Sequence, residues 1–421
     1  MVRLLVVAAI IAFVPCCAPR PWIGVARTGS LTDLQRYVEV AAERRQFSAS
    51  RTGQLAEIVA EREIATAADF AAYDRVVALE GCASELYWPL KHRSQGNDDI
   101  AAAASLVLLE SGLRDWDEKD LSHVHSSSGA WRAVAARAAV RPEDRPQVYA
   151  ALVDSDLRVR RAAIRTIHAD PMLADGRALV EAARLDPDIQ LRQSALSTLG
   201  DLGDLNSLLL VKDLWDEMTE SARVAYLQAL SAPASRIHGG LQILTRVMEA
   251  DESLEGVVAA SLLCRGSNPP SGYAISRLVQ ALRDGTLSER LVALSSLPES
   301  EPELQKELSK LALADDPYLR VAALELWLKM PARAEQARQR LQAIAASKDV
   351  DALEASRVLA VRGDESSILR VERRLGAPHS GERIAVARLM LRLKRWGAVA
   401  RALTDDHPAV RLATACNVLA Q

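Results

Sequence analysis

The stretch that decides the fold is Val159-Arg160-Arg161-Ala162-Ala163: an apolar residue, an arginine, two further residues and an alanine. The same phrase returns elsewhere, as Leu191-Arg192-Gln193-Ser194-Ala195, Leu319-Arg320-Val321-Ala322-Ala323 and, in degenerate form, Val410-Arg411-Leu412-Ala413-Thr414. Self-similarity at a period of about 20–50 residues is typical of a solenoid, in which each repeat packs on its neighbours. The phrase therefore predicts a repeat architecture, which is suited to binding but names no ligand.

The arginine of the phrase marks a column that runs along most of the chain. Its positions are Ala101, Arg132, Arg160, Arg192, Arg223, Val257, Arg290, Arg320, Glu354, Arg383 and Arg411, with spacings of 28 to 34 residues. Eight of these eleven positions are arginine, where the composition of the chain would place about one by chance. Such an excess indicates that the column has a common role in every repeat.

Each phrase lies in a pattern that predicts an amphipathic helix. Val159, Ala163, Ile164 and Ile167 fall on one face of such a helix, and the residues around Leu191 repeat this pattern. A second amphipathic run precedes each phrase, and the turns between them carry aspartate, serine and proline, which cap or begin helices. One repeat is thus two paired helices, and no strand pattern is found.

This unit resembles the HEAT repeat, most closely the short bacterial variety called phycobilisome-lyase-type. The resemblance rests on the pattern Asp-x-x-Val/Leu-Arg-x-x-Ala-x-x-x-Leu on the second helix of a pair, and it covers residues 97–421. It implies an all-α fold, a right-handed α-α superhelix of about eleven helix pairs similar to armadillo-like arrays. Most members of the family are binding scaffolds and a few are enzymes.

The N-terminus resembles the signal sequence of a bacterial lipoprotein. Residues 4–14 form an uncharged apolar run of eleven residues behind Arg3, which is too short to span a bilayer. Cys16 and Cys17 follow it, and the resemblance makes them the expected lipidation site. The small residues usual before such a cysteine are missing, so a signal cleaved otherwise, an uncleaved anchor and a misassigned start remain alternatives. We expect a signal at 1–17, a tether at 18–30, a helical N-terminal cap at 31–96 and the repeat array at 97–421.

The remaining cysteines are Cys82, Cys264 and Cys416, which lie far apart in apolar helical patterns. The sequence favours three small buried apolar residues over a disulfide. No zinc, redox, phosphate-binding or hydrolase motif is found in the sequence. His123 and His125 are expected in a solvated loop, and the paired aspartates of the turns are expected to cap helices rather than to bind calcium. We therefore expect no metal, no cofactor and no catalytic residue.

The basic cluster around the first phrase is the best candidate for a partner-binding surface. Arg158, Arg161 and Arg165 should lie on the side of the second helix away from its apolar stripe, although a merely solvated face is the simpler reading. Arg160 belongs to the column. We expect the column arginines to pair with an aspartate one turn earlier, as Arg160 with Asp156, Arg192 with Asp188 and Arg320 with Asp316.

The sequence as a whole predicts a non-catalytic protein-interaction scaffold. Its 52 basic and 55 acidic residues give a net charge of −3, so no global field would attract nucleic acid. We expect a monomer that binds a protein partner and faces the periplasm or exterior from a membrane surface, to which its lipidated N-terminus holds it. A bilin-lyase-like enzyme and a nucleic-acid-binding HEAT protein are the alternatives.

Overall fold

The fold is all-α, as the sequence predicted. A computed structural model describes residues 21–67, 70–213, 215–250, 253–266, 272–298 and 301–421. Over these residues it contains twenty-seven α-helices and short 3-10 turns, and no strand. The helices form two compact units, which are described separately. Unit 1 comprises the chain up to Leu113 and from Glu372 onward, and unit 2 runs from Arg114 to Val371.

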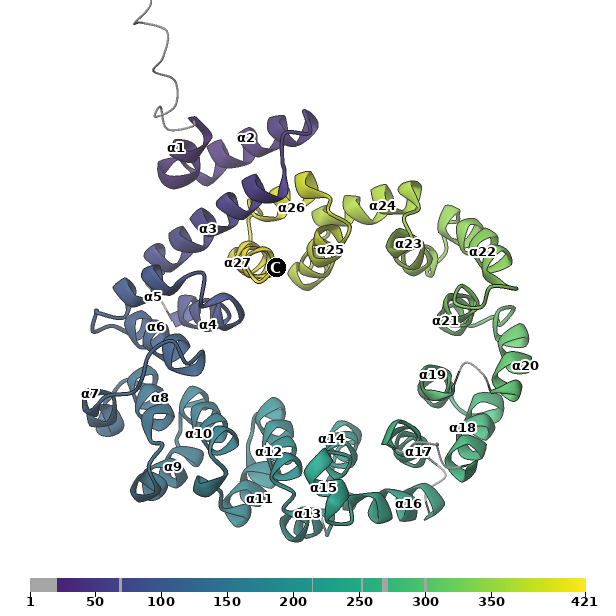
Figure 1. Ribbon diagram of the computed structural model, residues 1–421, viewed down its shortest axis with the longest axis horizontal. Coiled ribbons are helices and arrows are strands. Elements are labelled where there is room, and N and C mark those ends of the chain that lie inside the picture. Colours follow the sequence, from purple (N-terminus) through teal and green to yellow (C-terminus); the bar gives the residue numbers. More distant parts are fainter. Residues whose placement is uncertain (1–20, 68–69, 214, 251–252, 267–271, 299–300) are drawn as a thin grey trace, which may run out of the picture. The chain divides into compact units, whose positions relative to one another are not determined.

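Unit 2 is a solenoid of stacked helix pairs, with the first helix of each pair in an outer row and the second in an inner row (Figure 1). The inner row consists of α8 (Gly129–Ala138), α10 (Leu157–Ala169), α12 (Ile189–Leu202), α14 (Glu220–Leu230), α17 (Leu254–Gly266), α19 (Leu287–Ser296), α21 (Pro317–Trp327) and α23 (Ala352–Val361). The outer row consists of α7 (Glu118–Ser122), α9 (Arg145–Leu152), α11 (Gly176–Leu185), α13 (Leu205–Lys212), α16 (Gly240–Ala250), α18 (Gly272–Asp284), α20 (Pro302–Leu311), α22 (Ala334–Ala346) and α24 (Glu365–Glu372), which ends at the boundary of the unit. A short helix, α15 (Pro233–Ile237), connects α14 to α16.

The helix starts follow from the turn residues that the sequence analysis singled out. Asp156 and Asp188 are the N-caps of α10 and α12, and their carboxylates accept hydrogen bonds from backbone N–H groups of the first helical turn. At the other end of α12, Gly203 adopts a left-handed conformation with φ 69°, which a glycine reaches without steric cost. The expected capping role of these two aspartates is confirmed.

Alanine lets the inner helices approach closely. The column three residues after the arginine column is at most 2 % exposed at Ala104, Ala135, Ala163, Ala195, Ala260, Ala293 and Ala323. The predicted apolar stripe of α10, from Val159 to Ile167, is buried as well. Side chains without long stems leave the helix backbones close together, so neighbouring repeats pack directly on one another.

The expected pairing of the column arginines with the preceding aspartate is wrong. The guanidinium of Arg160 donates from Nε to Asp186 Oδ2 at 2.6 Å and from Nη1 to the carbonyl oxygen of Asp154 at 2.9 Å. Asp156, its expected partner, is occupied as a helix cap and by Arg158. A carboxylate that accepts the N–H groups of its own helix is directed away from the next turn, so the arginine reaches forward to the following repeat.

The same two-sided contact recurs along unit 2 as an arginine ladder. Each member donates to a backbone carbonyl before its own helix, to an acid of the following repeat, or to both. The acidic partners are Asp154 for Arg132, Asp186 for Arg160, Glu255 for Arg223 and Asp351 for Arg320. Arg192 and Arg320 donate to the carbonyl oxygens of Asp186 and Ala314, six residues earlier in each case. Asp154 and Asp186 each serve two arginines, one through the carboxylate and one through the carbonyl, so the repeats from α8 to α12 are linked continuously.

Unit 1 brings the two ends of the described chain together. Its N-terminal part consists of α1 (Pro21–Thr28), α2 (Leu31–Glu43), α3 (Ala49–Thr66), α4 (Phe70–Val77), α5 (Tyr87–Arg93) and α6 (Asp99–Glu110), and its C-terminal part of α25 (Ser380–Arg392), α26 (Trp396–Ala402) and α27 (Pro408–Leu419). Helix α2 packs on α26 and α3 packs on α27 (Figure 1). The N-terminal helices thereby cover the last pair of the repeat array.

The N-terminal helix α2 is antiparallel to its partner α26. Near the start of α2, Gln35 Nε2 donates to the carbonyl oxygen of Thr404 at 2.9 Å, just after the end of α26. Farther along α2, Glu39 binds Arg401 at 3.1 Å. The reversed direction means that α2 and α3 do not extend the array as an ordinary repeat would, which explains why the arginine column cannot be fitted to residues 31–96.

The ladder nevertheless continues across this junction. Arg383 binds Asp405, and the carbonyl oxygen of Asp405 accepts a hydrogen bond from Arg411 at 2.7 Å. Arg411 Nε in turn donates to Glu63 Oε1 of α3 at 2.6 Å. Only 12 % of the Arg411 side chain and 13 % of the Glu63 side chain are exposed. The last arginine of the column therefore finds its acid at the beginning of the chain.

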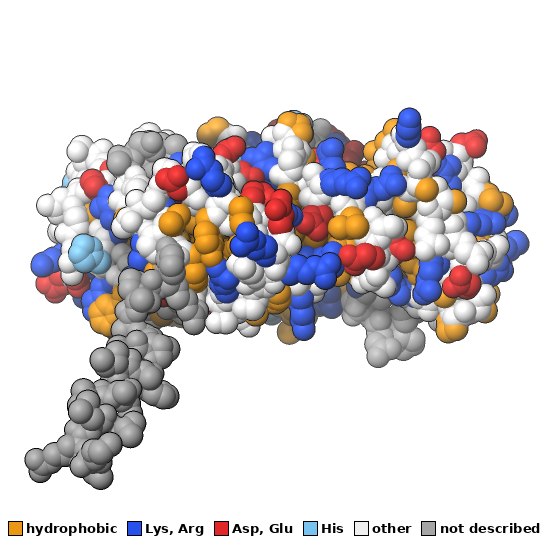
Figure 2. Space-filling view, turned by 90° about the horizontal axis from the view of Figure 1, so that it is seen from above, with side chains coloured by type: hydrophobic (Ala, Val, Ile, Leu, Met, Phe, Trp, Pro, Cys, Tyr) orange, Lys and Arg blue, Asp and Glu red, His pale blue; other side chains and the backbone are white. Residues whose placement is uncertain are grey.

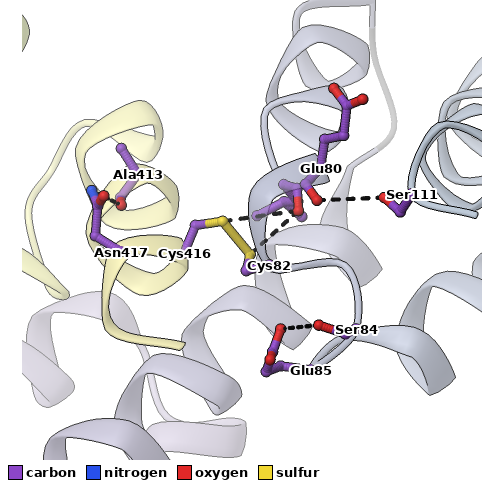
Figure 3. Close-up of a disulfide and its surroundings, with 9 residues drawn as sticks. Glu80, Cys82, Ser84, Glu85, Ser111, Ala413, Cys416 and Asn417 are labelled. Atoms are coloured by element: carbon purple, nitrogen blue, oxygen red, sulfur yellow. Dashed lines mark hydrogen bonds between the residues drawn. A yellow bond between two sulfur atoms is a disulfide. The ribbon is translucent and has the colours of Figure 1, made fainter. Parts of the chain in front are cut away.

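A disulfide between Cys82 and Cys416 adds a covalent link to this junction (Figure 3). Cys82 lies in a 3-10 turn (Glu80–Cys82) and Cys416 on α27, with a Cα–Cα distance of 5.2 Å and a sequence separation of 334 residues. The interpretation of these two cysteines as small buried apolar residues is wrong, whereas Cys264 is buried and free, as expected. Burial raises the pKa of the Cys264 thiol, which keeps it protonated and unreactive.

We expect the disulfide to stabilise unit 1. Joining residues so far apart restricts the unfolded chain, and disulfides of this kind contribute about 2–4 kcal/mol. Cys82→Ser should therefore melt at lower temperature than the parent, and a dithiol reductant should lower the parent to the same value without changing the variant. Cys264→Ser is the control and should still respond to reductant. Equal melting of the parent with and without reductant, with the disulfide shown to be reduced, would contradict this expectation.

Candidate functional site: the inner face of unit 2

The candidate surface lies on α10, whose buried stripe orients the remaining side chains outward. Val159 and Ile167 are buried against neighbouring helices, so Arg161 and Arg165 lie on the opposite side of the helix, where both are exposed. Arg161 keeps 49 % of its side chain exposed and approaches Asp188 of α12 at 3.4 Å. This loose contact in solvent contributes little to stability, so the guanidinium can exchange it for a partner.

Arg158 stands apart from the other two arginines. Its Nε and Nη2 donate to the carboxylate of Asp156 at 2.9 and 2.5 Å, and only 11 % of its side chain is exposed. The hydrogen bonds from Arg158 hold the pKa of Asp156 below its usual range, against the opposing effect of burial. Arg158 therefore belongs to the turn before α10 and leaves Arg161 and Arg165 as the exposed pair.

Arg160, the ladder arginine that precedes Arg161 in the sequence, differs from it in burial. Arg160 is 8 % exposed and its partner Asp186 is 5 % exposed, so this pair is enclosed between two repeats. Arg161 is turned about 100° farther around the helix and faces solvent. Arg160 and Arg161 are adjacent in the sequence, but the rotation of the helix places the first between two repeats and the second in solvent.

The exposed side chains of the inner face change from basic to mostly uncharged between α10 and α14. The exposed arginines of α10 give way to uncharged amides and hydroxyls on the next two helices. These are Gln190, Gln193, Ser194 and Ser197 of α12 and Ser221 and Gln228 of α14, which line a groove of about 800 Å³ between the two helices. Glutamine and serine on an exposed helix face form no motif, so these residues could not be recognised in the sequence.

His123, which was expected in a solvated loop, contacts an aromatic side chain. His123 stacks on Trp131 with ring centroids 4.3 Å apart. Within the described ranges, no group of three or more His, Cys, Asp or Glu side chains is arranged to hold a metal ion. On the face seen in Figure 2, basic and acidic side chains are interspersed over the described surface, in agreement with the near-zero net charge of the chain.

The expected lipidation site, Cys16 or Cys17, lies outside the described residues. Where the structure does describe the chain, none of its helices combines the length and the apolar character needed to cross a membrane.

Comparison with known proteins gives little further information. No protein-family model matches the chain, and no curated protein matches it. Among solved structures, the crystal structure of an engineered protein is similar over 72 % of this chain and 98 % of its own length, at 17 % sequence identity and a TM-score of 0.29. So slight a likeness says nothing of what the chain binds.

Proposed function

We propose that this chain is a non-catalytic, HEAT-like interaction scaffold of the extracytoplasmic space, held at a membrane surface by lipid on Cys17 or Cys16. Its partner is a protein that binds the inner face of unit 2. The observation that carries this proposal is the exposed pair Arg161 and Arg165, next to an arginine ladder that already satisfies the structural need for arginine in the same helix.

The unused hydrogen-bond donors of Arg161 support this proposal. An arginine offers five N–H donors in a planar fork that matches a carboxylate. At Arg160 these donors serve the packing of two repeats, whereas the one acidic partner of Arg161 among the described residues is Asp188, at 3.4 Å. Arginine is also enriched in protein interfaces and at their hot spots. Arg161, with the exposed Arg165 beside it, therefore suits an acidic group of a protein partner.

Charge reversal tests the partner-binding half of the proposal. Arg161→Glu combined with Arg165→Glu should leave the melting temperature nearly unchanged and should weaken capture of partners from envelope extracts, most strongly at low salt. Arg177→Glu with Arg184→Glu is the matched control, because these two exposed arginines lie on the outer helix α11. Equal capture by both double variants and the parent would contradict the assignment of the inner face.

Mass spectrometry of the mature N-terminus, with fatty-acid labelling, tests the anchor. We expect a lipid-modified Cys17 or Cys16 as the first residue. An unmodified N-terminus downstream of Ala18 would exclude lipidation, and the scaffold would then need another means of reaching a membrane.

A further inference from the structure

We propose that the groove between α12 and α14 binds an extended, uncharged polypeptide segment through the main-chain amides of that segment. The proposal rests on the proposed scaffold function and adds the chemical class of the bound segment. It concerns a site next to the exposed arginines of α10 but lined by different residues.

Small residues form the floor of the groove. A side-chain carbon placed on Gly200 of α12 would lie 2.6 Å from the carbonyl oxygen of Ala229 of α14, so the two helix backbones are in direct contact there. Gly200 is itself buried and does not line the groove, whereas Ala225, Ala229 and Ala232 line it on the side of α14. The groove between the two helices has a volume of about 800 Å³ and is open to solvent.

The walls offer hydrogen-bonding groups that the protein itself does not use. Among the described residues, the carboxamides of Gln190, Gln193 and Gln228 have no hydrogen-bond partner within the protein; Gln190 and Gln228 are exposed and Gln193 is partly exposed. By contrast, Ser194 and Ser197 in the same groove already donate to the carbonyl oxygen of Gln190 and to Asp201. A carboxamide has an acceptor oxygen and two N–H donors, which are complementary to the C=O and N–H of a peptide group.

The lining argues against the other large classes of ligand. Asp201 is the one charged residue among the lining residues, and it stands near His168, 3.8 Å away. A nucleic acid needs cationic side chains for its phosphates, and none lines the groove. The lining also contains no aromatic ring on which a sugar or a base could stack. An extended peptide with uncharged side chains needs neither.

The spacing of the helices fits an extended chain. Neighbouring helices pack about 8–10 Å apart, and an extended chain advances about 3.3 Å per residue. Gln228 adjoins Ala229, which contacts Gly200, whereas Gln193 lies seven residues, about 10 Å, before Gly200 along α12. Together with the separation across the groove, this offset places the peptide groups that would meet Gln193 and Gln228 about four residues apart. Val224 and Pro233 add small apolar contacts along the same path.

The test uses the full chain and a library of random twelve-residue peptides. We expect selection to enrich peptides poor in charged residues and in proline, since proline lacks the N–H that a carboxamide would accept. Gln193→Ala combined with Gln228→Ala should weaken a selected peptide at least tenfold, while Gln242→Ala on the outer helix α16 should not weaken it. Because the carboxamides of Gln193 and Gln228 have no hydrogen-bond partner among the described residues of the protein, the melting temperature of their variants should be unchanged.

Methylation of single backbone amides in the selected peptide provides the second readout. Loss of binding at positions about four residues apart supports recognition of the main chain. The proposal is overturned if no peptide is enriched, if the enriched peptides are charged, or if their binding survives Gln193→Ala with Gln228→Ala. The Arg161→Glu, Arg165→Glu variant separates the two sites: if it still abolishes partner capture when the peptide test fails, the scaffold proposal stands and the groove proposal falls.

Discussion

Arg160→Ala should lower the free energy of unfolding of unit 2 by about 3–5 kcal/mol, the loss typical of breaking one side of a buried ion pair. The substitution removes the guanidinium from Asp186, whose side chain is 3 % exposed, and leaves that carboxylate enclosed between two repeats. It also removes the donor to the carbonyl oxygens of Asp154 and Ser155. Chemical denaturation of the parent and the variant measures the difference.

Arg192→Ala is the matched control for this prediction. Arg192 occupies the same column, but among the described residues its guanidinium binds the carbonyl oxygen of Asp186, at 2.7 Å, and no acid of the following repeat. Losing one such bond costs about 1 kcal/mol. Equal destabilisation of the two variants would show that the ion pair with the following repeat does not account for the stabilising effect of the column. The ladder would then be a set of independent contacts between each arginine and its own turn.

Deleting residues 396–421 should unfold unit 1 while leaving unit 2 folded. The deletion removes α26 and α27, and with them the helices that cover α2, α3 and the buried face of α25, which includes Val386 and Met390. It also removes Cys416 and the carboxylate that binds Arg383. In a repeat protein the loss should stay local, because each repeat depends mainly on its neighbours.

Hydrogen exchange on the truncated protein reports this result segment by segment. We expect lost protection at both 31–66 and 380–392 and parent-like protection from α10 to α14. Cys416→Ser is the control, because it breaks the covalent link but keeps the packing of α27 on α3. Retained protection of 31–66 in the truncated protein would show that the N-terminal helices fold without the C-terminal ones.

The sequence was sufficient for the fold class because its evidence is periodic. The capping aspartates Asp156 and Asp188 and the buried alanine column follow from helix chemistry within a single repeat, and both are confirmed. The acidic partner of a column arginine could not be predicted in the same way, because it lies in another repeat. A helix pattern shows which side chains share a face but not how far the next repeat is rotated, so Asp186 could not be chosen over Asp156 from spacing alone.

The junction in unit 1 was missed for a similar reason. Cys82 and Cys416 are 334 residues apart, and nothing local connects them. In α3 the position that arginine occupies in other repeats, four residues after the N-cap, is held by Thr52, which is fully buried. Because α2 is antiparallel to α26, neither the phrase nor its register carries over to this part of the chain.

The candidate surface was predicted in part. Arg161 and Arg165 are exposed, as the helix pattern requires, whereas Arg158 turns back to Asp156. The groove between α12 and α14 could not be predicted from the sequence. Its glutamines become noticeable only when the structure shows that their carboxamides have no partner within the described protein.

The most direct test of the central claim measures melting and partner capture on the same two proteins, Arg160→Ala and Arg161→Glu with Arg165→Glu. The claim is that neighbouring arginines of one helix divide their roles, one holding repeats together and the others binding the partner. It predicts that Arg160→Ala melts early but captures the partner normally at temperatures where it is folded, while the double variant melts like the parent and loses capture. Normal melting with lost capture in Arg160→Ala would contradict it and would make the arginine ladder itself the binding surface.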